Sequence, residues 1–307
     1  MTDTIISTRN ISKKFGNFFA VDNINIQVKK GEIYGLVGKN GAGKTTLLKM
    51  INGLSIPSSG SLKLFSESSG SGIENMRSKI GTIIETPSFF PYLSAEKNLE
   101  YYRIQRGIED KNCVNNSLEF VGLSNVGNKK FNNFSLGMKQ RLGLALAIMG
   151  NPELLILDEP INGLDPMGMA EFREIILKLN HEKNTTILIS SHILGELSQI
   201  ATCYGFINKG KLIERVSTSE LKEKCKRTLN IKVNDTNKAS DVLKNKLSCT
   251  NFEISDDNEI RTDEFMNTPE VLVRTLVLND IDVYNVNQSG LNLEQYFIEL
   301  VGGIHNV

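Results

Sequence analysis

The sequence predicts an α/β fold in which helices cover both faces of a parallel sheet, followed by a smaller α+β unit. The first observation is a set of short apolar runs, typical of strands buried on both faces. They span residues 33–37, 154–157 and 186–189. The second is helical periodicity elsewhere in the same part of the chain, over residues 45–52, 94–107, 112–121, 136–149 and 169–179. Strands that alternate with helices favour a parallel sheet.

The two ends of the chain have a different pattern. Residues 5–31 predict short alternating strands with a turn at 14–17, and the Ser- and Gly-rich stretch 66–72 predicts a flexible surface turn. After about residue 219 the predicted order is βαββαβ with a last helix, typical of a small ferredoxin-like module. We therefore predict two domains, 1–219 and 220–307, with a helical subdomain at about 90–150 in the first.

The composition is that of a soluble globular protein. The chain has 307 residues, of which 40% are hydrophobic and 23% charged. Lys and Arg together number 35, as do Asp and Glu, so no bulk positive field favours nucleic acid as a partner. The N-terminus lacks a signal-peptide pattern, and no apolar run approaches the ~18 residues needed to span a bilayer.

The cysteines form no close pair and no metal-ligand spacing. The chain has four of them, Cys113, Cys203, Cys225 and Cys249. In a chain of this length such spacing indicates unpaired thiols in a reducing cytosol.

A Walker A pattern lies between a predicted buried strand and a predicted helix; it runs Gly38-Lys39-Asn40-Gly41-Ala42-Gly43-Lys44-Thr45. The glycines let backbone N–H groups turn toward phosphate oxygens, and the helix N-terminus adds partial positive charge. Lys44 is expected to reach the β- and γ-phosphates, and the Thr45 hydroxyl to bind Mg²⁺. The candidate ATP-binding residues here are Gly38, Asn40, Gly41, Ala42, Gly43, Lys44, Thr45 and Thr46.

A second buried run ends in two carboxylates, Asp158 and Glu159. Ligands bind at the carboxyl ends of strands in open parallel sheets. Asp158 is placed to hold Mg²⁺ through water, and Glu159 to polarise the attacking water. Taken alone, the pair could equally be a solvated helix entrance. The Walker A loop upstream favours the catalytic interpretation.

Between these motifs lies the run Phe134-Ser135-Leu136-Gly137-Met138-Lys139-Gln140-Arg141. It resembles the signature segment of ATP-binding-cassette (ABC) ATPases. Walker A, this run, the acidic strand end and His192 follow the ABC order and spacing, and the resemblance covers about residues 4–220. It implies a P-loop NTPase cassette, with a parallel-sheet core, an antiparallel N-terminal sheet and a helical subdomain.

The resemblance assigns further roles. Phe15 matches the aromatic residue on which adenine stacks, although a lone Phe is more often part of a core. Val21 falls where the family packs a small apolar side chain beneath the ring and ribose. Asp165 belongs to a segment matching the D-loop, which contacts the partner subunit, and His192 matches the switch histidine at the γ-phosphate.

In the family, two cassettes hold two ATP molecules between them, each bound by one subunit's Walker A loop and the other's signature. The resemblance therefore implies a homodimer in which Ser135 and the Gly137 backbone donate to the γ-phosphate of ATP held by the partner. The signature residues expected to act across this interface are Ser135, Leu136, Gly137 and Met138.

Two features depart from the commonest family pattern. Leu136 and Met138 replace the usual Gly and Gln of the signature. At the Q-loop position Glu85 replaces Gln, in Ile83-Ile84-Glu85-Thr86-Pro87. A carboxylate can still bind Mg²⁺, but it adds charge beside the metal and the attacking water. We therefore place Glu85 among both the metal ligands and the catalytic residues.

An aromatic stretch follows Glu85 and includes Phe89, Phe90 and Tyr92. It lies where transporter cassettes form a groove for the permease, although core packing is the alternative. The bacitracin- and lantibiotic-resistance branch of exporters is resembled by four features together: Glu85, the signature Ser135-Leu136-Gly137-Met138-Lys139, Asn162 and the small C-terminal module. The leading hypothesis is thus a peripheral ATPase at the cytoplasmic face of the membrane, driving a separate permease.

The competing hypothesis is a soluble ABC ATPase with a mechanical role in DNA repair or on ribosomes. The chain has no room for the coiled coil of repair-type members between Glu85 and Ser135, and it has one cassette where ribosome-type members have two. A third alternative, a P-loop kinase or GTPase outside the family, would not explain the signature run or His192.

Overall fold

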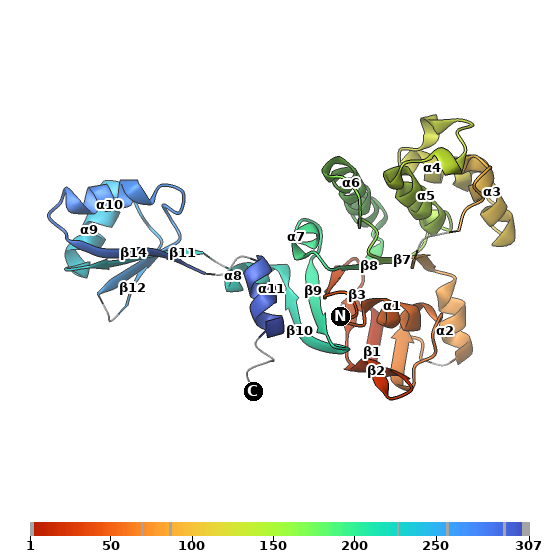
Figure 1. Cartoon of the computed structure of the whole chain (residues 1–307), viewed down its shortest axis with the longest axis horizontal. Coiled ribbons are helices and arrows are strands. Elements are labelled where there is room, and N and C mark those ends of the chain that lie inside the picture. The colour runs from red at the N-terminus through yellow and green to blue at the C-terminus, as the bar shows by residue number, and fades with distance from the viewer. Residues whose placement is uncertain are drawn as a thin grey trace. The chain divides into compact units, whose positions relative to one another are not determined.

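The computed structural model describes residues 3–68, 70–85, 88–225, 227–255, 258–290 and 293–302. The chain divides into two compact units, the first ending at Thr218 and the second beginning at Ser219 (Figure 1).

The first unit opens with an antiparallel sheet. Its long strand β1 (Thr4–Phe15) pairs with β2 (Phe18–Ile24), β3 (Gln27–Lys29) and β5 (Ser59–Leu64). The pairing of β1 with β2 has register shifts near Lys13. Such irregularities change which side chains face the core, including those around Ala20 on β2.

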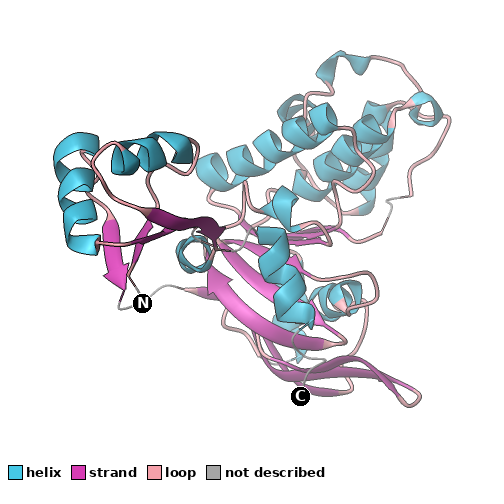
Figure 2. Cartoon of the chain, turned by 60° about the vertical axis from the view of Figure 1, so that its left-hand side comes forward, coloured by secondary structure: helices cyan, strands magenta, loops and turns pink. Residues whose placement is uncertain are grey.

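A six-stranded sheet carries the predicted site (Figure 2). Its order is β10 (Lys211–Ser217), β9 (Cys203–Asn208), β4 (Ile33–Val37), β8 (Thr186–Ser191), β7 (Leu154–Asp158) and β6 (Ile80–Ile83). Neighbouring strands are parallel from β9 to β6, while β10 and β9 form an antiparallel pair. The predicted parallel sheet is confirmed, and the carboxyl ends of β4, β7 and β8 lie at one edge of it.

Helix α1 (Lys44–Asn52) joins the two sheets. Its buried side chains Leu47, Leu48 and Ile51 belong to one hydrophobic core with residues of both sheets. The helix begins after Gly43 and ends at Gly53, each with a left-handed backbone that glycine adopts readily. Because α1 starts directly after β4, the core fixes its N-terminus beside the carboxyl ends of the strands.

Three helices of the first unit are capped by side chains that the sequence supplies. Asp165 caps α6 (Pro166–Lys183) and Pro166 occupies its first turn. Ser94 caps α3, and Ser135 caps α5. Helices α3 (Ala95–Gln105), α4 (Asn112–Phe120) and α5 (Leu136–Ile148) pack on one another and form the helical part of the unit.

Helix α2 (Gly70–Arg77) was not expected. The Ser- and Gly-rich composition of 66–72 predicts a turn there, and Ser69 lies outside the described residues. The short helix α7 (Leu194–Leu197) follows β8, and α8 (Thr218–Lys224) spans the boundary between the units.

The second unit contains a four-stranded antiparallel sheet in the order β12, β13, β11, β14. Its elements follow the βαββαβ order of split βαβ modules, with a last helix. They are β11 (Thr228–Val233), α9 (Thr236–Leu247), β12 (Phe252–Ser255), β13 (Glu259–Thr262), α10 (Pro269–Val277), β14 (Val283–Ser289) and α11 (Leu293–Gly302). Leu229, Ile231, Leu243 and Leu272 belong to a hydrophobic core of its own.

All four cysteines are free thiols, as predicted. Burial, with the carboxylate of Glu32 as the next cause, raises the pKa of Cys203 to about 11, so this thiol stays protonated at neutral pH. Among the described residues, no helix is both long and apolar enough to cross a bilayer.

Candidate nucleotide site

The loop between β4 and α1 requires glycine at particular positions. Gly41 and Gly43 have φ of 80° and 108°, where other residues are strained. A Cβ on Gly43 would also lie 2.4 Å from the carbonyl oxygen of Ala20, and one on Gly38 would lie 2.5 Å from that of Ile207. The loop is therefore tightly enclosed on one side, which holds it at the N-terminus of α1, where the helix dipole favours an anion.

Lys44 is buried within this loop, with only 4% of its surface exposed. Its Nζ donates to the carbonyl oxygens of Gly38 at 2.6 Å and Lys39 at 3.2 Å. It also forms an ion pair with Glu159 Oε1 at 3.0 Å. A phosphate at the loop would compete with Glu159 for the same ammonium group.

Thr45 and Asp158 face each other across the ends of α1 and β7. The Thr45 hydroxyl donates to Asp158 Oδ2 at 2.6 Å, and the Ser190 hydroxyl donates to Asp158 Oδ1 at 2.6 Å. Ser190 also accepts a bond from the Glu159 backbone N–H at 3.0 Å. One buried serine thus positions the Asp158 carboxylate and the Glu159 backbone.

Ser190 is not among the site residues predicted from the sequence, although the sequence carries a signal for it. The two neighbouring buried strands are in register, so that Asp158 pairs with Ser190. Polar residues at the carboxyl ends of adjacent parallel strands meet at one edge. Aligning the ends of the two predicted strands would have placed this serine beside the carboxylate.

Glu159 connects the loop to His192. His192 Nδ1 lies 2.9 Å from Glu159 Oε2, and Asn162 donates to the same oxygen at 3.5 Å. The backbone of Glu159 has a φ of 46°, a conformation that non-glycine residues adopt rarely and often at functional sites. Lys44, Glu159 and His192 thus form one continuous polar chain.

The side chains of Thr45 and Asp158, beside this polar network, fit a magnesium ion. Mg²⁺ prefers oxygen ligands and takes one or two carboxylates together with substrate phosphates. The Thr45 hydroxyl and the Asp158 carboxylate supply such oxygens, and Ser190 orients the carboxylate. The third expected ligand is not among them: Glu85 pairs instead with Lys49, at 2.5 Å.

A cavity of about 350 Å³ extends from the loop to the exposed end of β1. Its lining residues are Phe15, Phe18, Ala20, Asn40, Gly41, Gly43, Lys44, Thr45, Thr46 and Glu159. The structure therefore brings Phe15 together with most of the predicted loop residues. The Phe15 ring is 55% exposed, with Lys13 Nζ 5.2 Å from its centroid, so the ring is not buried in the core.

The assignment of Val21 to the ribose is not supported. Val21 is fully buried in the core between the sheets. Ala20, one residue earlier on β2, lines the cavity instead. Side chains alternate between the two faces of a strand, so an error of one residue exchanges the core face for the ligand face.

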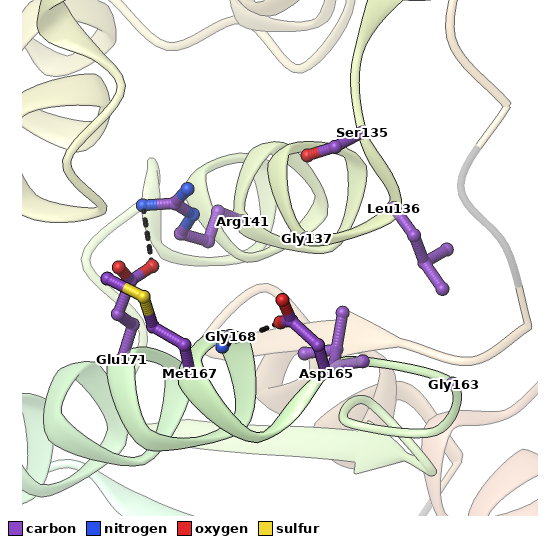
Figure 3. Close-up of a pocket in the computed structure, with 10 residues that line it drawn as sticks. Ser135, Leu136, Gly137, Arg141, Gly163, Asp165, Met167, Gly168 and Glu171 are labelled. Carbon is purple, nitrogen blue, oxygen red and sulfur yellow. Dashed lines mark hydrogen bonds and ion pairs between the residues drawn. The ribbon is translucent and has the colours of Figure 1, made fainter.

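The signature residues line a separate cavity of about 390 Å³, between the N-terminal ends of α5 and α6 (Figure 3). Ser135, Leu136 and Gly137 come from α5 and its cap, and Asp165 caps α6 by accepting a bond from the Gly168 N–H at 2.9 Å. No lining residue is shared with the cavity of the phosphate loop. Met138, in the first turn of α5, donates its backbone N–H to Ser135 Oγ at 3.3 Å.

Gly137 has no steric reason for being glycine within its own chain. A Cβ at this position would find its nearest neighbour at 3.8 Å, the Leu164 side chain. Ser135 is exposed on the same turn. The surface at Gly137 therefore leaves room for a group from outside the chain to approach the backbone.

The aromatic stretch after Glu85 divides into core and surface. Phe89 is buried, with its ring 5.1 Å from that of Phe131, so its assignment to a groove is wrong and the core-packing alternative holds for it. Phe90 and Tyr92 are exposed. Asn98 is fully buried and bonds the backbone N–H and carbonyl of Phe90, which fixes the segment. Thr86 and Pro87 lie outside the described residues.

A phosphate loop, a hydroxyl paired with a carboxylate, and a glutamate beside a histidine are typical of a P-loop nucleoside triphosphatase. A family model described as ABC transporter matches residues 21–162. The chain belongs to this family of ATP-binding transporter subunits, which confirms the predicted cassette fold of the first unit and identifies the protein as an ATPase.

Three similar proteins illustrate how far the likeness extends. The bacitracin transport ATP-binding protein BcrA of Enterococcus faecalis is 44% identical over 299 residues, 97% of each chain. The lantibiotic transport ATP-binding protein SrtF of Streptococcus pyogenes is 43% identical over 209 residues, 68% of this chain and 89% of its own. The structure of cbiO1 from Clostridium perfringens is 27% identical, with a TM-score of 0.66, and covers 72% of this chain and 92% of its own.

Proposed function

We propose that this protein is the ATP-hydrolysing subunit of an exporter for antimicrobial peptides of the bacitracin or lantibiotic type. Two chains close around ATP and drive a separate membrane permease. The observation that carries the proposal of export is the 44% identity to a bacitracin transport subunit over 97% of both chains, C-terminal unit included. The polar chain of Lys44, Glu159 and His192 supports hydrolysis.

Binding of ATP begins at the cavity of the phosphate loop. The adenine stacks on Phe15, above Ala20, and the loop N–H groups receive the phosphates. Lys44 exchanges its contact with Glu159 for the β- and γ-phosphates. Thr45 and Asp158 would hold Mg²⁺, which would neutralise charge on the phosphates.

Before ATP binds, Lys44 forms an ion pair with Glu159, the proposed general base. Once Lys44 turns to the γ-phosphate, the Glu159 carboxylate is free to orient and polarise the attacking water. His192 contacts the γ-phosphate from the other side of Glu159, and Ser190 keeps both strand ends in register.

The signature acts on a second chain. Its cavity shares no lining residue with that of the phosphate loop, and the glycine at 137 leaves room for an approach from outside. In the proposed dimer, Ser135 and the Gly137 N–H donate to the γ-phosphate held by the partner's loop. Asp165 lies at the same interface.

The exposed aromatics Phe90 and Tyr92, close in sequence to Glu85, are proposed as part of the contact with the permease. Their ordered backbone and exposed rings suit a docking surface. The chain would then act at the cytoplasmic face of the membrane as a peripheral subunit.

The catalytic assignment is tested by Glu159→Gln. Hydrolysis should fall by at least about 10²-fold, because the amide cannot act as a base, while ATP binding persists and an ATP-bound dimer accumulates. The matched control is Glu153→Gln, a surface carboxylate paired with Lys79. Unchanged ATPase activity in Glu159→Gln would overturn the assignment.

Export is tested in a peptide-sensitive bacterial host that expresses the chain together with a membrane permease from its source organism. Resistance to bacitracin or a lantibiotic should rise and should disappear with Glu159→Gln. The alternative, a soluble ATPase acting on ribosomes or DNA, predicts instead that the chain pellets with ribosomes or DNA and leaves peptide resistance unchanged.

A further inference from the structure

Glu85 has a specific partner that its family role does not require. Its carboxylate forms an ion pair with Lys49 Nζ at 2.5 Å. Lys49 lies on α1, four residues after Thr45. Residues four apart lie on one helix face, about one turn along the axis. Glu85 is therefore held about one turn away from the hydroxyl proposed to bind the metal.

The strand that precedes Glu85 brings it close to the catalytic carboxylates. Strands β6 and β7 are parallel, and Ile83 pairs with Leu157. Glu85 and Glu159 thus follow neighbouring strands at equivalent positions, where strands lie about 4.8 Å apart. A carboxylate at 85 adds negative charge beside Asp158 and Glu159, and Lys49 balances it.

Lys49 holds the Glu85 carboxylate through Oε1, about one helical turn from Thr45, so the side chain would have to leave Lys49 to reach a metal at Thr45 and Asp158. The ion pair is partly exposed, with side-chain exposures of 33% for Lys49 and 66% for Glu85. Exposed pairs are weak, so this one can be broken by a competing divalent cation. The Glu85 backbone has a φ of 65°, so the carboxylate projects from a turn rather than from the regular strand.

We propose that Lys49 is a positioning residue that holds Glu85 on α1 until Mg²⁺ and nucleotide bind, and then releases it to the metal. The inference rests on the proposed magnesium site at Thr45 and Asp158. It assigns Lys49 a role that depends on the carboxylate at 85 and that a glutamine there would not support.

Lysine reactivity tests the pairing directly. An amine-acetylating reagent is applied to the nucleotide-free protein in EDTA, and the rate at Lys49 is read by mass spectrometry against the exposed Lys63. Glu85→Gln should raise the rate at Lys49 several-fold. In the wild-type protein, Mg²⁺ with a non-hydrolysable ATP analogue should do the same, and the analogue in EDTA should not.

The Glu85→Gln protein controls for any effect of dimerisation on the exposure of Lys49. In this variant, Mg²⁺ with the analogue should not raise the acetylation rate at Lys49 further. Equal rates at Lys49 in the wild-type and Glu85→Gln proteins would overturn the proposal. The proposal would also be overturned if Mg²⁺ with the analogue left the acetylation rate at Lys49 of the wild-type protein unchanged.

A double-mutant comparison gives a second readout. Lys49→Met removes the competing charge, so the Mg²⁺ concentration for half-maximal binding of a fluorescent ATP analogue should fall about twofold to fivefold. In a Glu85→Gln background the same substitution should have no effect, and Lys63→Met should have none in either. A fall of equal size in both backgrounds would overturn the proposal.

The proposed magnesium site at Thr45 and Asp158 and the proposed role of Lys49 can fail separately. If Mg²⁺ does not strengthen analogue binding in any variant, the magnesium site itself fails. If Mg²⁺ strengthens binding but Lys49→Met acts equally with and without Glu85, the site stands and only the role of Lys49 is lost.

Discussion

Gly43 has a positive φ, and a Cβ there would also clash with the carbonyl oxygen of Ala20. Gly41 has a positive φ too, but open space around it. Gly41→Ala should therefore destabilise the nucleotide-free chain by strain alone, about 1 kcal/mol. Gly43→Ala should destabilise it by clearly more, because the loop or β2 must also move. Urea unfolding in EDTA measures both. Equal losses would show that the contact with Ala20 is unimportant.

At the scale of elements, one substitution in helix α5 should affect dimerisation without lowering the stability of the chain. Gly137 lies in its first turn with room for a side chain. Gly137→Ala should leave the free energy of unfolding unchanged or raise it by about 0.5–1 kcal/mol, because alanine favours a helix over glycine. The same methyl group should block the approach of a partner's nucleotide.

The measurements for Gly137→Ala are urea unfolding of the isolated chain and ATP-dependent dimerisation in a Glu159→Gln background. A variant that is both fully stable and unable to dimerise is the expected outcome. Gly150→Ala is the control, since no atom lies within 4 Å of a Cβ there and it follows the far end of α5. Normal dimerisation of Gly137→Ala would contradict the proposed approach.

At the scale of the whole molecule, the core between the sheets and the core of the C-terminal unit share no residue. Calorimetry of the full chain should therefore resolve two unfolding transitions. A ligand stabilises only the unit that binds it. Mg²⁺ with a non-hydrolysable ATP analogue should raise the midpoint of one transition and leave the other unchanged; one cooperative transition would contradict this expectation.

Motifs that consist of neighbouring residues could be predicted from the sequence, and contacts between distant strands could not. Lys44 and Asp158 were identified because a glycine loop and an acidic strand end are local patterns. Ser190 depends on the register of two strands more than thirty residues apart in the sequence. Ala20 was missed because the register shifts between β1 and β2 decide which face of β2 meets the cavity.

Predictions from local composition were also wrong where packing overrides the local conformational preference. Residues 70–77 form a helix although glycine and serine disfavour one, and Ile73 and Met76 pack against the core between the sheets. Phe89 follows a proline-containing segment, which suggested a surface loop, yet its ring packs among Tyr102 and Phe131. In both places the neighbouring element, unknown from the sequence, determines the outcome.

The separate cavities of the phosphate loop and the signature have a genetic consequence. In the proposed homodimer, each site would combine the phosphate loop of one chain with the signature of the other. A chain altered at Gly137 and a chain altered at Lys44 should therefore complement each other when both are made in one cell, because their mixed pair would contain one complete site.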